Sequence, residues 1–339
     1  MEKRKLVRSG MFSHTVTLPR EWVTRHKLDK GKTVYLEEQA DGLLIKPGKA
    51  EKKPTNETEE KVIYVDNVSP NSILRDITSS FLSNIGTIRL VGKSLRQNIA
   101  LFKKNILRFP GFEVIEETSD FLLVKDFINI EELVIPNLLR RADTIIRSLI
   151  LDSFECLDTK DQKLAEAIRL RDQEVNRLVF LIYKCLNYIS EHPQEGESRG
   201  VHPSYITHVW ELNGYLEKIG DEIKRFAMGI PKAKLSKQET KEMESLLKET
   251  EILYTETMTS LYTNNIMRSD KAADQRNKTV EKCNAYLAKS HSLHGRPMVS
   301  RLVYTISFIN SISRIIRYIT FEKRKIVKGS IFVTQKSQL

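Results

Sequence analysis

The sequence predicts a multidomain protein with three parts: a small β-rich module at the N-terminus, a small α/β domain, and an all-α bundle of two three-helix repeats. Three observations lead to this fold class. The chain has 339 residues, which is more than one compact domain usually fills. Its hydrophobic pattern changes near residues 60 and 130. Residues 48–60 are rich in charge and proline and almost free of apolar side chains, so we expect a linker there.

Residues 1–47 are expected to form short strands around one short helix. Residues 15–18 alternate apolar and polar side chains, as a half-buried strand does. Pro19 suits the first turn of a helix, because its missing N–H would have no partner there. Residues 28–31, Leu-Asp-Lys-Gly, resemble the stop after that helix. Residues 41–42, Asp-Gly, predict the turn of a hairpin.

Residues 61–128 alternate between strand and helix patterns, which predicts a small α/β layer. We expect strands at residues 61–65, 87–91, 112–115 and 121–124, and helices over residues 70–83 and 99–107. Residues 92–94, Gly-Lys-Ser, stand where a helix begins after a strand and would suit an anion. They lack the preceding glycine of a P-loop. The layer is expected either to sense a ligand or to act as a spacer.

Residues 130–326 have a helical pattern almost throughout. Apolar residues recur at helical spacing in six stretches, with breaks near residues 157–161, 191–200, 229–231 and 295–297. Two successive sets of three helices predict a duplicated antiparallel bundle. A basic tail, residues 327–339, follows the bundle.

The composition excludes several classes of protein. With 40% hydrophobic and 29% charged residues, the chain is expected to fold as a soluble protein. It has no run of about 18 apolar residues and no secretory signal, so we expect no membrane insertion. Cys156, Cys185 and Cys283 lack C-x-x-C spacing, which favours a reducing cytoplasm over a zinc site or disulfides.

The net charge of +11 lies at the two ends of the chain. Residues 1–50 hold 11 basic and 6 acidic residues, and residues 296–339 hold 9 basic and 1 acidic. Basic modules attract nucleic acid, and Lys or Arg on short strands can contact phosphates and bases. The alternative is that both ends are solvated faces or tails. The candidate DNA-binding residues are Lys3, Arg4, Lys5, Arg8, Arg20, Arg25 and Lys27. Because so short a module has little core, we also expect it to dimerise.

Two acidic motifs occur on predicted helices of the first repeat. Glu217 and Asp221 are four residues apart and therefore share one helix face. Asp172 and Asn176 repeat this spacing on the preceding helix. Carboxylates placed in this way can coordinate or bridge hard or borderline cations. These four residues are the candidate metal ligands, and Gly220 would let the two helices approach closely.

The alternative interpretation of these acids is an ordinary solvated helix face, on which Asp221 pairs with Lys224 or Arg225. Catalytic motifs are missing: the sequence contains no Glu-x-x-His, no G-x-G-x-x-G and no G-x-S-x-G. A metal-dependent enzyme built on Glu217 and Asp221 would lack a histidine ligand and a clear base. We therefore expect a protein that is not an enzyme.

Residues 6–47 resemble a SpoVT/AbrB-type domain. The resemblance is carried by T-V-T-L-P-x-x-W at residues 15–22, L-D-K-G at residues 28–31 and the Asp-Gly turn at residues 41–42. It implies a swapped-hairpin homodimer, or a higher even oligomer, that binds double-stranded DNA through basic strand and loop residues. Domains of this type also serve as dimerisers or antitoxin-like modules.

Residues 130–326 resemble the PhoU family of phosphate-uptake regulators, which are pairs of three-helix repeats. The resemblance is carried by D-Q-E-V-N-R-L-V-F-L-I at residues 172–182 and L-E-K-I-G-D-E-I at residues 216–223. These segments match the family's acidic motifs, E/D-x-x-x-D, which bind iron or other metal clusters. The resemblance therefore implies a divalent metal or an iron cluster in this bundle.

The sequence departs from the PhoU motifs in two places. Asn176 replaces an acid in the first repeat, and Ser313 and Arg317 stand where the last helix would carry its acids. We therefore expect no second metal cluster. The order of the modules, SpoVT/AbrB-like before PhoU-like, resembles archaeal PhoU-type regulators.

Two functions are compatible with these features. The first is a DNA-binding transcriptional regulator of phosphate uptake, in which the N-terminal dimer binds DNA and the bundle senses the state of a metal or a partner. The second is an adaptor that docks on a phosphate transporter or its ATPase and inhibits transport, with the N-terminal domain serving only for dimerisation.

Overall fold

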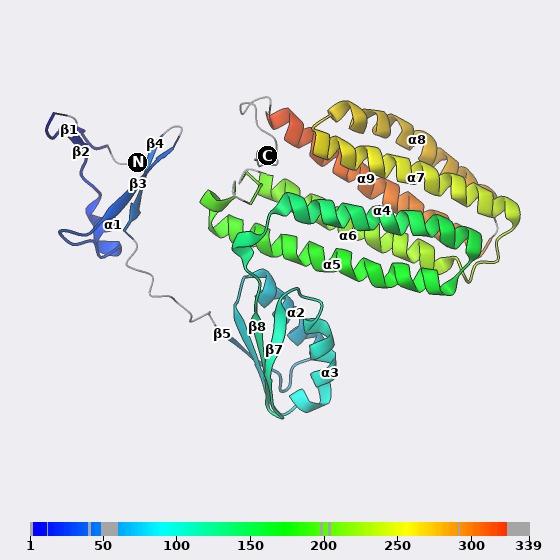
Figure 1. Ribbon diagram of the computed structural model, residues 1–339, viewed down its shortest axis with the longest axis horizontal. Helices are drawn as coiled ribbons and strands as arrows, with labels where there is room; N and C mark the ends of the chain where they lie inside the picture. Colours follow the sequence, from blue (N-terminus) through cyan, green and yellow to red (C-terminus); the bar gives the residue numbers. More distant parts are fainter. Residues whose placement is uncertain are drawn as a thin grey trace, which may run out of the picture. The chain divides into compact units, whose positions relative to one another are not determined.

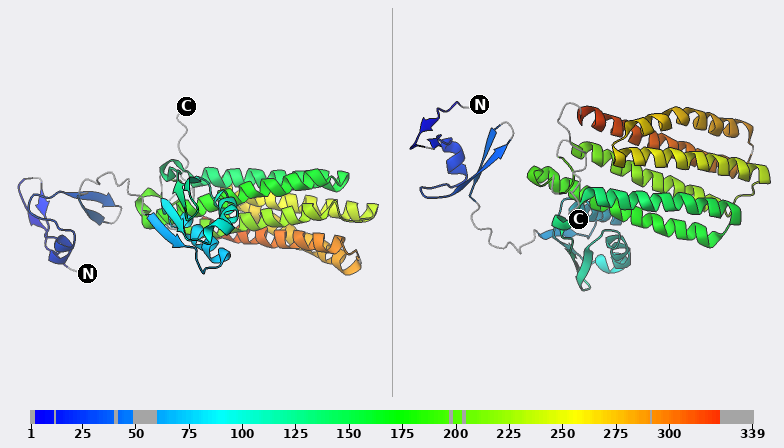
Figure 2. Two further views of the ribbon diagram at one scale, coloured as in Figure 1. Left: turned by 90° about the horizontal axis from the view of Figure 1, so that it is seen from below. Right: turned by 45° about the horizontal axis from the view of Figure 1, so that its top comes forward.

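Residues 3–11, 13–39, 42–48, 60–196, 199–202, 205–290 and 292–323 are described by a computed structural model. The chain divides into two compact units, residues 1–57 and 58–339. Figures 1 and 2 colour both units along the chain, with the first unit in blue. Most of the expected linker and all of the expected basic tail lie outside the described residues.

The N-terminal unit consists of two small antiparallel pairs of strands and one short helix (Figure 1). Its elements are β1 (Val7–Arg8), β2 (His14–Thr15), α1 (Arg20–Arg25), β3 (Val34–Gln39) and β4 (Gly42–Pro47). Strand β1 pairs with β2, and β3 pairs with β4 in the predicted hairpin, where Gln39 is opposite Gly42. The strand expected over residues 15–18 is shorter than predicted and ends at Thr15.

Helix α1 ends at a residue in the left-handed conformation. The N–H of Lys27 donates to the carbonyl of Thr24 at 3.1 Å, and the N–H of Leu28 donates to the carbonyl of Val23 at 3.0 Å. These two bonds make a Schellman motif, which usually places glycine where Lys27 stands, with φ of 50°. The last helical residue is Arg25, and the left-handed residue Lys27 directly precedes the expected Leu-Asp-Lys-Gly signal.

None of the residues of the N-terminal unit whose burial the structure describes (3–11, 13–36, 43–45 and 47–48) is buried. Met11 is 76% exposed and Leu6 is 67% exposed, and the hairpin exposes several further apolar side chains. The large exposed apolar residues of this unit are Leu6, Val7, Met11, Val16, Tyr35, Leu36, Leu43 and Leu44. A single copy of the unit thus has no hydrophobic core of its own in the described residues.

The second unit begins with a four-stranded sheet. Its elements are β5 (Glu60–Tyr64), α2 (Pro70–Leu82), β6 (Thr87–Val91), α3 (Leu95–Ile106), β7 (Phe112–Glu117) and β8 (Phe121–Asp126). The strand order is β5-β6-β8-β7, with β5 and β6 parallel and the other neighbours antiparallel. Side chains of α2, α3 and one face of the sheet share a single hydrophobic cluster. The α/β layer expected over residues 61–128 is thereby confirmed.

The α/β layer packs against helix α5 of the bundle through a buried ion pair. The Lys184 ammonium is 2% exposed and lies 2.7 Å from Oδ2 of Asp126 at the end of β8. The same ammonium donates to the carbonyl of Phe81 at 3.0 Å. Next to it, Phe180 of α5 meets Phe109 with ring centroids 5.0 Å apart. The layer is therefore held on α5 by both charge and apolar packing.

Six long helices make up the rest of the second unit (Figures 1 and 2). They are α4 (Ile135–Thr159), α5 (Gln162–Glu191), α6 (Ile206–Gly229), α7 (Lys237–Thr263), α8 (Ile266–Lys289) and α9 (Gly295–Lys323). Helices α4–α6 pack together, as do α7–α9, and the two sets meet where α6 runs along α9 and α4 along α7. No helix within the described residues is long and apolar enough to cross a membrane. The predicted pair of three-helix repeats is confirmed.

The two repeats share a detail at the end of their first helices. Lys160 after α4 and Asn264 after α7 both adopt the left-handed conformation, with φ of 54° and 53°. The next residue in each case, Asp161 or Asn265, caps the following helix with its side chain. This shared turn supports an internal duplication that residue identity between the halves does not reveal.

Candidate functional site

The acidic motifs of α5 and α6 face each other, as the sequence predicts. Asp172 of α5 is 1% exposed and lies against α6. Gly220 allows this approach, because a Cβ atom there would lie only 3.0 Å from Oδ1 of Asp172. One turn along α5, Asn176 donates to Oδ2 of Asp172 at 3.3 Å. The helices thus bring the candidate ligands of both motifs to one place.

A lysine lies between the two motifs. Nζ of Lys224 is 2.6 Å from Oδ2 of Asp172 and also pairs with Oδ1 of Asp221. Arg225 pairs with the other oxygen of Asp221 at 2.9 Å. Asp221 therefore pairs with both basic residues that the alternative interpretation of the sequence named. Burial alone would lower the pKa of Lys224, but hydrogen bonds to Asp172 and Asp221 raise it, so the ammonium stays charged.

Glu217 lies one turn before Asp221 on α6. Burial raises the pKa of Glu217, and the nearby carboxylates of Asp221 and Asp172 raise it further. Protonation of this side chain is thus favoured relative to an isolated glutamate. The Lys224 ammonium acts in the opposite direction and lowers the pKa of Glu217.

This arrangement does not fit a metal ion or an iron cluster. A cation held by Asp172 and Asp221 would occupy the position of the Lys224 ammonium, which already contacts both carboxylates. Within the described parts of the chain, no group of three or more His, Cys, Asp or Glu side chains is placed to hold a metal. The expected metal role of Asp172, Asn176, Glu217 and Asp221 is therefore unsupported by their geometry.

The equivalent place in the second repeat is also occupied by a basic side chain. Arg317 of α9 pairs with Asp270 of α8, and the hydroxyl groups of Ser313 and Ser269 share a hydrogen bond. The predicted departures at Ser313 and Arg317 thus have direct partners on α8. Sequence analysis missed Asp270, although Asp270 and Asp274 stand four residues apart on one helix, a spacing like that of the acidic motifs.

The anion site considered at Gly92-Lys93-Ser94 is filled by the chain itself. The Asp66 carboxylate accepts from the N–H of Lys93 at 3.0 Å and from the N–H of Ser94 at 2.8 Å. These hydrogen bonds from Ser94 and Lys93 lower the pKa of Asp66. Gly92 is required here, because it has φ of 149° and a Cβ atom would lie 2.8 Å from Asp66. Sequence reasoning did not identify Asp66, although its position just after strand β5 places it near the residues that follow the neighbouring strand β6.

The candidate DNA-binding side chains lie on the N-terminal unit, and all of them are exposed. Arg8 on β1 donates to the carbonyls of Gly10 and Met11 at 3.3 and 3.4 Å, so it also braces the turn before β2. The others precede β1, start or end α1, or follow it: Lys3, Arg4, Lys5, Arg20, Arg25 and Lys27. This placement leaves seven basic side chains open to solvent on one small unit.

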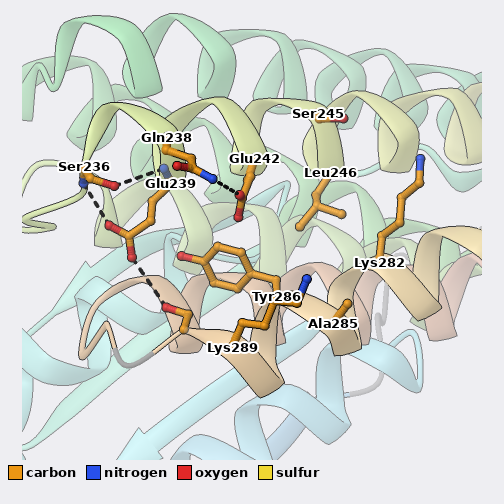
Figure 3. Close-up of a pocket in the computed structure, with 11 residues that line it drawn as sticks. Ser236, Gln238, Glu239, Glu242, Ser245, Leu246, Lys282, Ala285, Tyr286 and Lys289 are labelled. Carbon is orange, nitrogen blue, oxygen red and sulfur yellow. Dashed lines mark hydrogen bonds between the residues drawn. The ribbon is translucent and has the colours of Figure 1, made fainter.

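The bundle also carries a groove of about 600 Å³ between the start of α7 and the end of α8 (Figure 3). The N-terminus of α7 is closed by its own acid, since Ser236 and Glu239 form a capping box. Glu239 also accepts from Ser290 at 3.5 Å. Because this helix end is already satisfied by a carboxylate, the groove offers no free anion site there. It lies apart from both acidic motifs.

Comparison with known proteins finds a matching family for each unit. Residues 139–230, which span most of the first repeat, match the PhoU domain. Residues 13–53 match the antidote-toxin recognition MazE domain of bacterial antitoxins. A search of the curated proteins finds no match. Both matched domains belong to non-catalytic regulatory families, and they confirm the two resemblances inferred from the sequence.

Two solved structures are similar to the bundle. PhoU from Pseudomonas aeruginosa has 16% sequence identity and a TM-score of 0.45, over 54% of this chain and 94% of that one. The phosphate transport system regulatory protein PhoU from Streptococcus pneumoniae has 14% identity and a TM-score of 0.46, over 57% and 96%.

Proposed function

We propose that this chain, which carries a PhoU domain behind a MazE/AbrB-type domain, is a DNA-binding regulator of phosphate uptake. Its N-terminal units would pair and bind double-stranded DNA, and its helical bundle would respond to a partner. One observation carries the proposal: the N-terminal unit exposes both its basic side chains and its apolar side chains. Such a surface suits a dimer that presents positive charge to a polyanion.

The dimer follows from the lack of a core. Burying one large apolar side chain contributes about 1.5–3 kcal/mol, and eight such side chains remain exposed in a single copy. A module of this size rarely folds without a partner surface to cover them. A second copy of the same unit, with exchanged hairpins, would supply that surface. We therefore propose a homodimer or a higher even oligomer.

The charge of the unit supports DNA as the ligand. Residues 1–50 carry 11 basic and 6 acidic residues, and dimerisation would double that excess on one body. Exposed Lys and Arg side chains neutralise backbone phosphates, and this electrostatic contribution dominates the affinity for non-specific DNA. Lys27 has a backbone conformation that glycine would adopt with less strain. A strained backbone conformation at Lys27, where glycine would fit with less strain, favours a functional role for the positive charge of this side chain.

The PhoU domain supports a link to phosphate transport. We propose that the bundle contacts a phosphate transporter or its ATPase in the cytoplasm and has no catalytic activity. The α/β layer is fixed to α5 by Lys184 and Phe180, so it would move with the bundle rather than as a free sensor. Partner binding could then shift the spacing of the paired DNA-binding units.

A DNA-binding titration tests the proposal. The full chain is titrated into labelled duplex DNA from upstream of phosphate-transporter genes, at several salt concentrations, and light scattering measures its mass. We expect a dimer or higher even oligomer and an affinity that falls steeply with salt. Absence of binding at low salt would overturn the DNA role. Co-purification with the transporter in that case would instead favour the adaptor function.

A further inference from the structure

We infer that Lys224 is a built-in counter-ion that replaces a metal ion in the PhoU-type bundle. Its ammonium bridges Asp172 of α5 and Asp221 of α6, the two acids that stand where metal ligands are expected. The bridge joins two helices of the first repeat. It therefore does the structural work that a bound cation would otherwise do.

The burial of Asp172 makes a counter-charge necessary. This carboxylate is 1% exposed, and a buried charge is tolerated only when it is paired and hydrogen-bonded. Asn176 offers one weak hydrogen bond at 3.3 Å, whereas Lys224 offers a full positive charge at 2.6 Å. Among the described residues, Oδ1 of Asp172 has no hydrogen-bond partner. The site thus retains an unused acceptor that faces Gly220.

A divalent cation cannot join this arrangement without moving Lys224. It would have to bind the same two carboxylate groups as the ammonium, which already contacts one oxygen of each. Two cations held a few ångströms apart in a poorly solvated site repel each other strongly. The site can therefore hold either the ammonium or a metal ion. The ammonium is always present, because it belongs to the side chain of Lys224.

The second repeat also has an ion pair between its second and third helices, but with one acid instead of two. There Arg317 of the third helix pairs with Asp270 of the second helix. In both repeats, then, the third helix supplies the positive charge and the second helix supplies the acid. Arg317 and Asp270 are more exposed than the first pair, with 60% and 42% of their side chains accessible. An exposed pair of this kind contributes little to stability, so the structural role of a counter-ion is assigned to Lys224 alone, and this assignment does not depend on DNA binding.

Metal binding by wild type and variants tests the inference. The experiment would measure Mn²⁺ binding to the full chain by equilibrium dialysis, and Tm with and without Mn²⁺ or EDTA. The wild type should bind no Mn²⁺ at this site, and EDTA should leave its Tm unchanged. Lys224→Ala should lower Tm and bind Mn²⁺ about tenfold or more tightly than wild type, because the repelling ammonium is gone. Added Mn²⁺ should then raise its Tm.

Two further variants separate a metal site from a folding defect. Lys224→Ala combined with Asp172→Asn removes the buried carboxylate together with its counter-ion, so it should fold and lose the Mn²⁺ response. Lys282→Ala removes an exposed lysine that pairs with the partly buried Glu249 between α7 and α8, and it should gain no Mn²⁺ binding. A wild type that binds Mn²⁺ as tightly as Lys224→Ala, or loses Tm in EDTA, would overturn the inference. So would a folded Lys224→Ala that ignores Mn²⁺. If Lys224→Ala does not fold, a metal-free wild type and a folded double variant still support it.

Discussion

The N-terminal unit leaves its basic and apolar side chains exposed, whereas the second unit pairs its buried charges within itself. Lys184 is paired with Asp126, and Asp172 is paired with Lys224. The exposed carboxylate of Asp66 is likewise engaged, by the backbone amides of residues 93 and 94. A charge that is paired within the fold stabilises that fold, and it is not available to bind a ligand. The contrast is consistent with the proposal that the N-terminal unit binds DNA, while the buried ion pairs of the second unit stabilise its packing.

Removal of the Lys184 ammonium should have the largest effect on the second unit. Lys184→Met leaves Asp126 as a buried carboxylate without its partner, and it also removes the donor to Phe81. Loss of one member of a buried pair typically costs about 3–5 kcal/mol of unfolding free energy. Urea denaturation followed by circular dichroism at the helical band measures this change.

A matched surface variant completes the Lys184 experiment. Arg169→Ala removes one member of an exposed pair with Glu166 on the same helix, α5, and should leave the denaturation midpoint unchanged within error. Equal shifts in both variants would mean that the buried pair is no more important than a surface pair. The α/β layer would then be held on α5 by apolar packing alone.

Neutralisation of the N-terminal charges should have the next largest effect, on DNA binding. The triple variant Lys3→Gln, Arg4→Gln and Lys5→Gln should weaken affinity, and its salt slope should fall by about 0.9 for each phosphate that is no longer neutralised. Fluorescence anisotropy at several salt concentrations measures both quantities. The control neutralises three exposed basic residues in and just after α3, namely Lys103, Lys104 and Arg108. An equally weakened affinity in both triple variants would contradict the assignment of DNA binding to the N-terminal unit.

Most elements of both units could be predicted from the sequence because their signals are local, although the short strand β1 was not predicted. Helical spacing, turn residues and strand alternation act over a few positions, and they placed all six bundle helices. The charge pairs could not be predicted, because they join residues far apart in the chain: Asp172 and Lys224, or Asp126 and Lys184. An acidic motif has the same spacing whether a metal or a lysine lies beside it. Only the packing of α5 against α6 decides between them.

A smaller effect is expected at Lys27, where conformation and charge oppose each other. Lys27→Gly should raise the unfolding free energy of the N-terminal unit by about 1 kcal/mol, because glycine adopts the left-handed conformation without strain. If Lys27 neutralises one phosphate, the same change should reduce the salt slope of DNA binding by about 0.9. Thermal denaturation and anisotropy measure the two effects. Lys27→Arg keeps both the charge and the strain, so it should behave as wild type; a Lys27→Gly protein with full DNA affinity would remove Lys27 from the DNA-binding surface.

The smallest expected effect concerns Asp66, the internal anion of the α/β layer. Hydrogen bonds from Ser94 and Lys93 lower the pKa of Asp66 below its ordinary value of 3.8. A carboxyl group with a lowered pKa in the folded state stabilises the fold above pH 3.8, and this contribution disappears as the pH falls through the folded-state pKa. Asp66→Asn should therefore be less stable than wild type at neutral pH, and the two should converge in acid, as urea denaturation at a series of pH values would measure. Asp120→Asn, which removes an exposed carboxylate from the β7–β8 turn, is the control. If the unfolding free energies of Asp66→Asn and wild type differ by the same amount at every pH, the negative charge of Asp66 does not stabilise the start of α3. The hydrogen bonds that its side chain accepts would then stabilise the helix without any contribution from the charge.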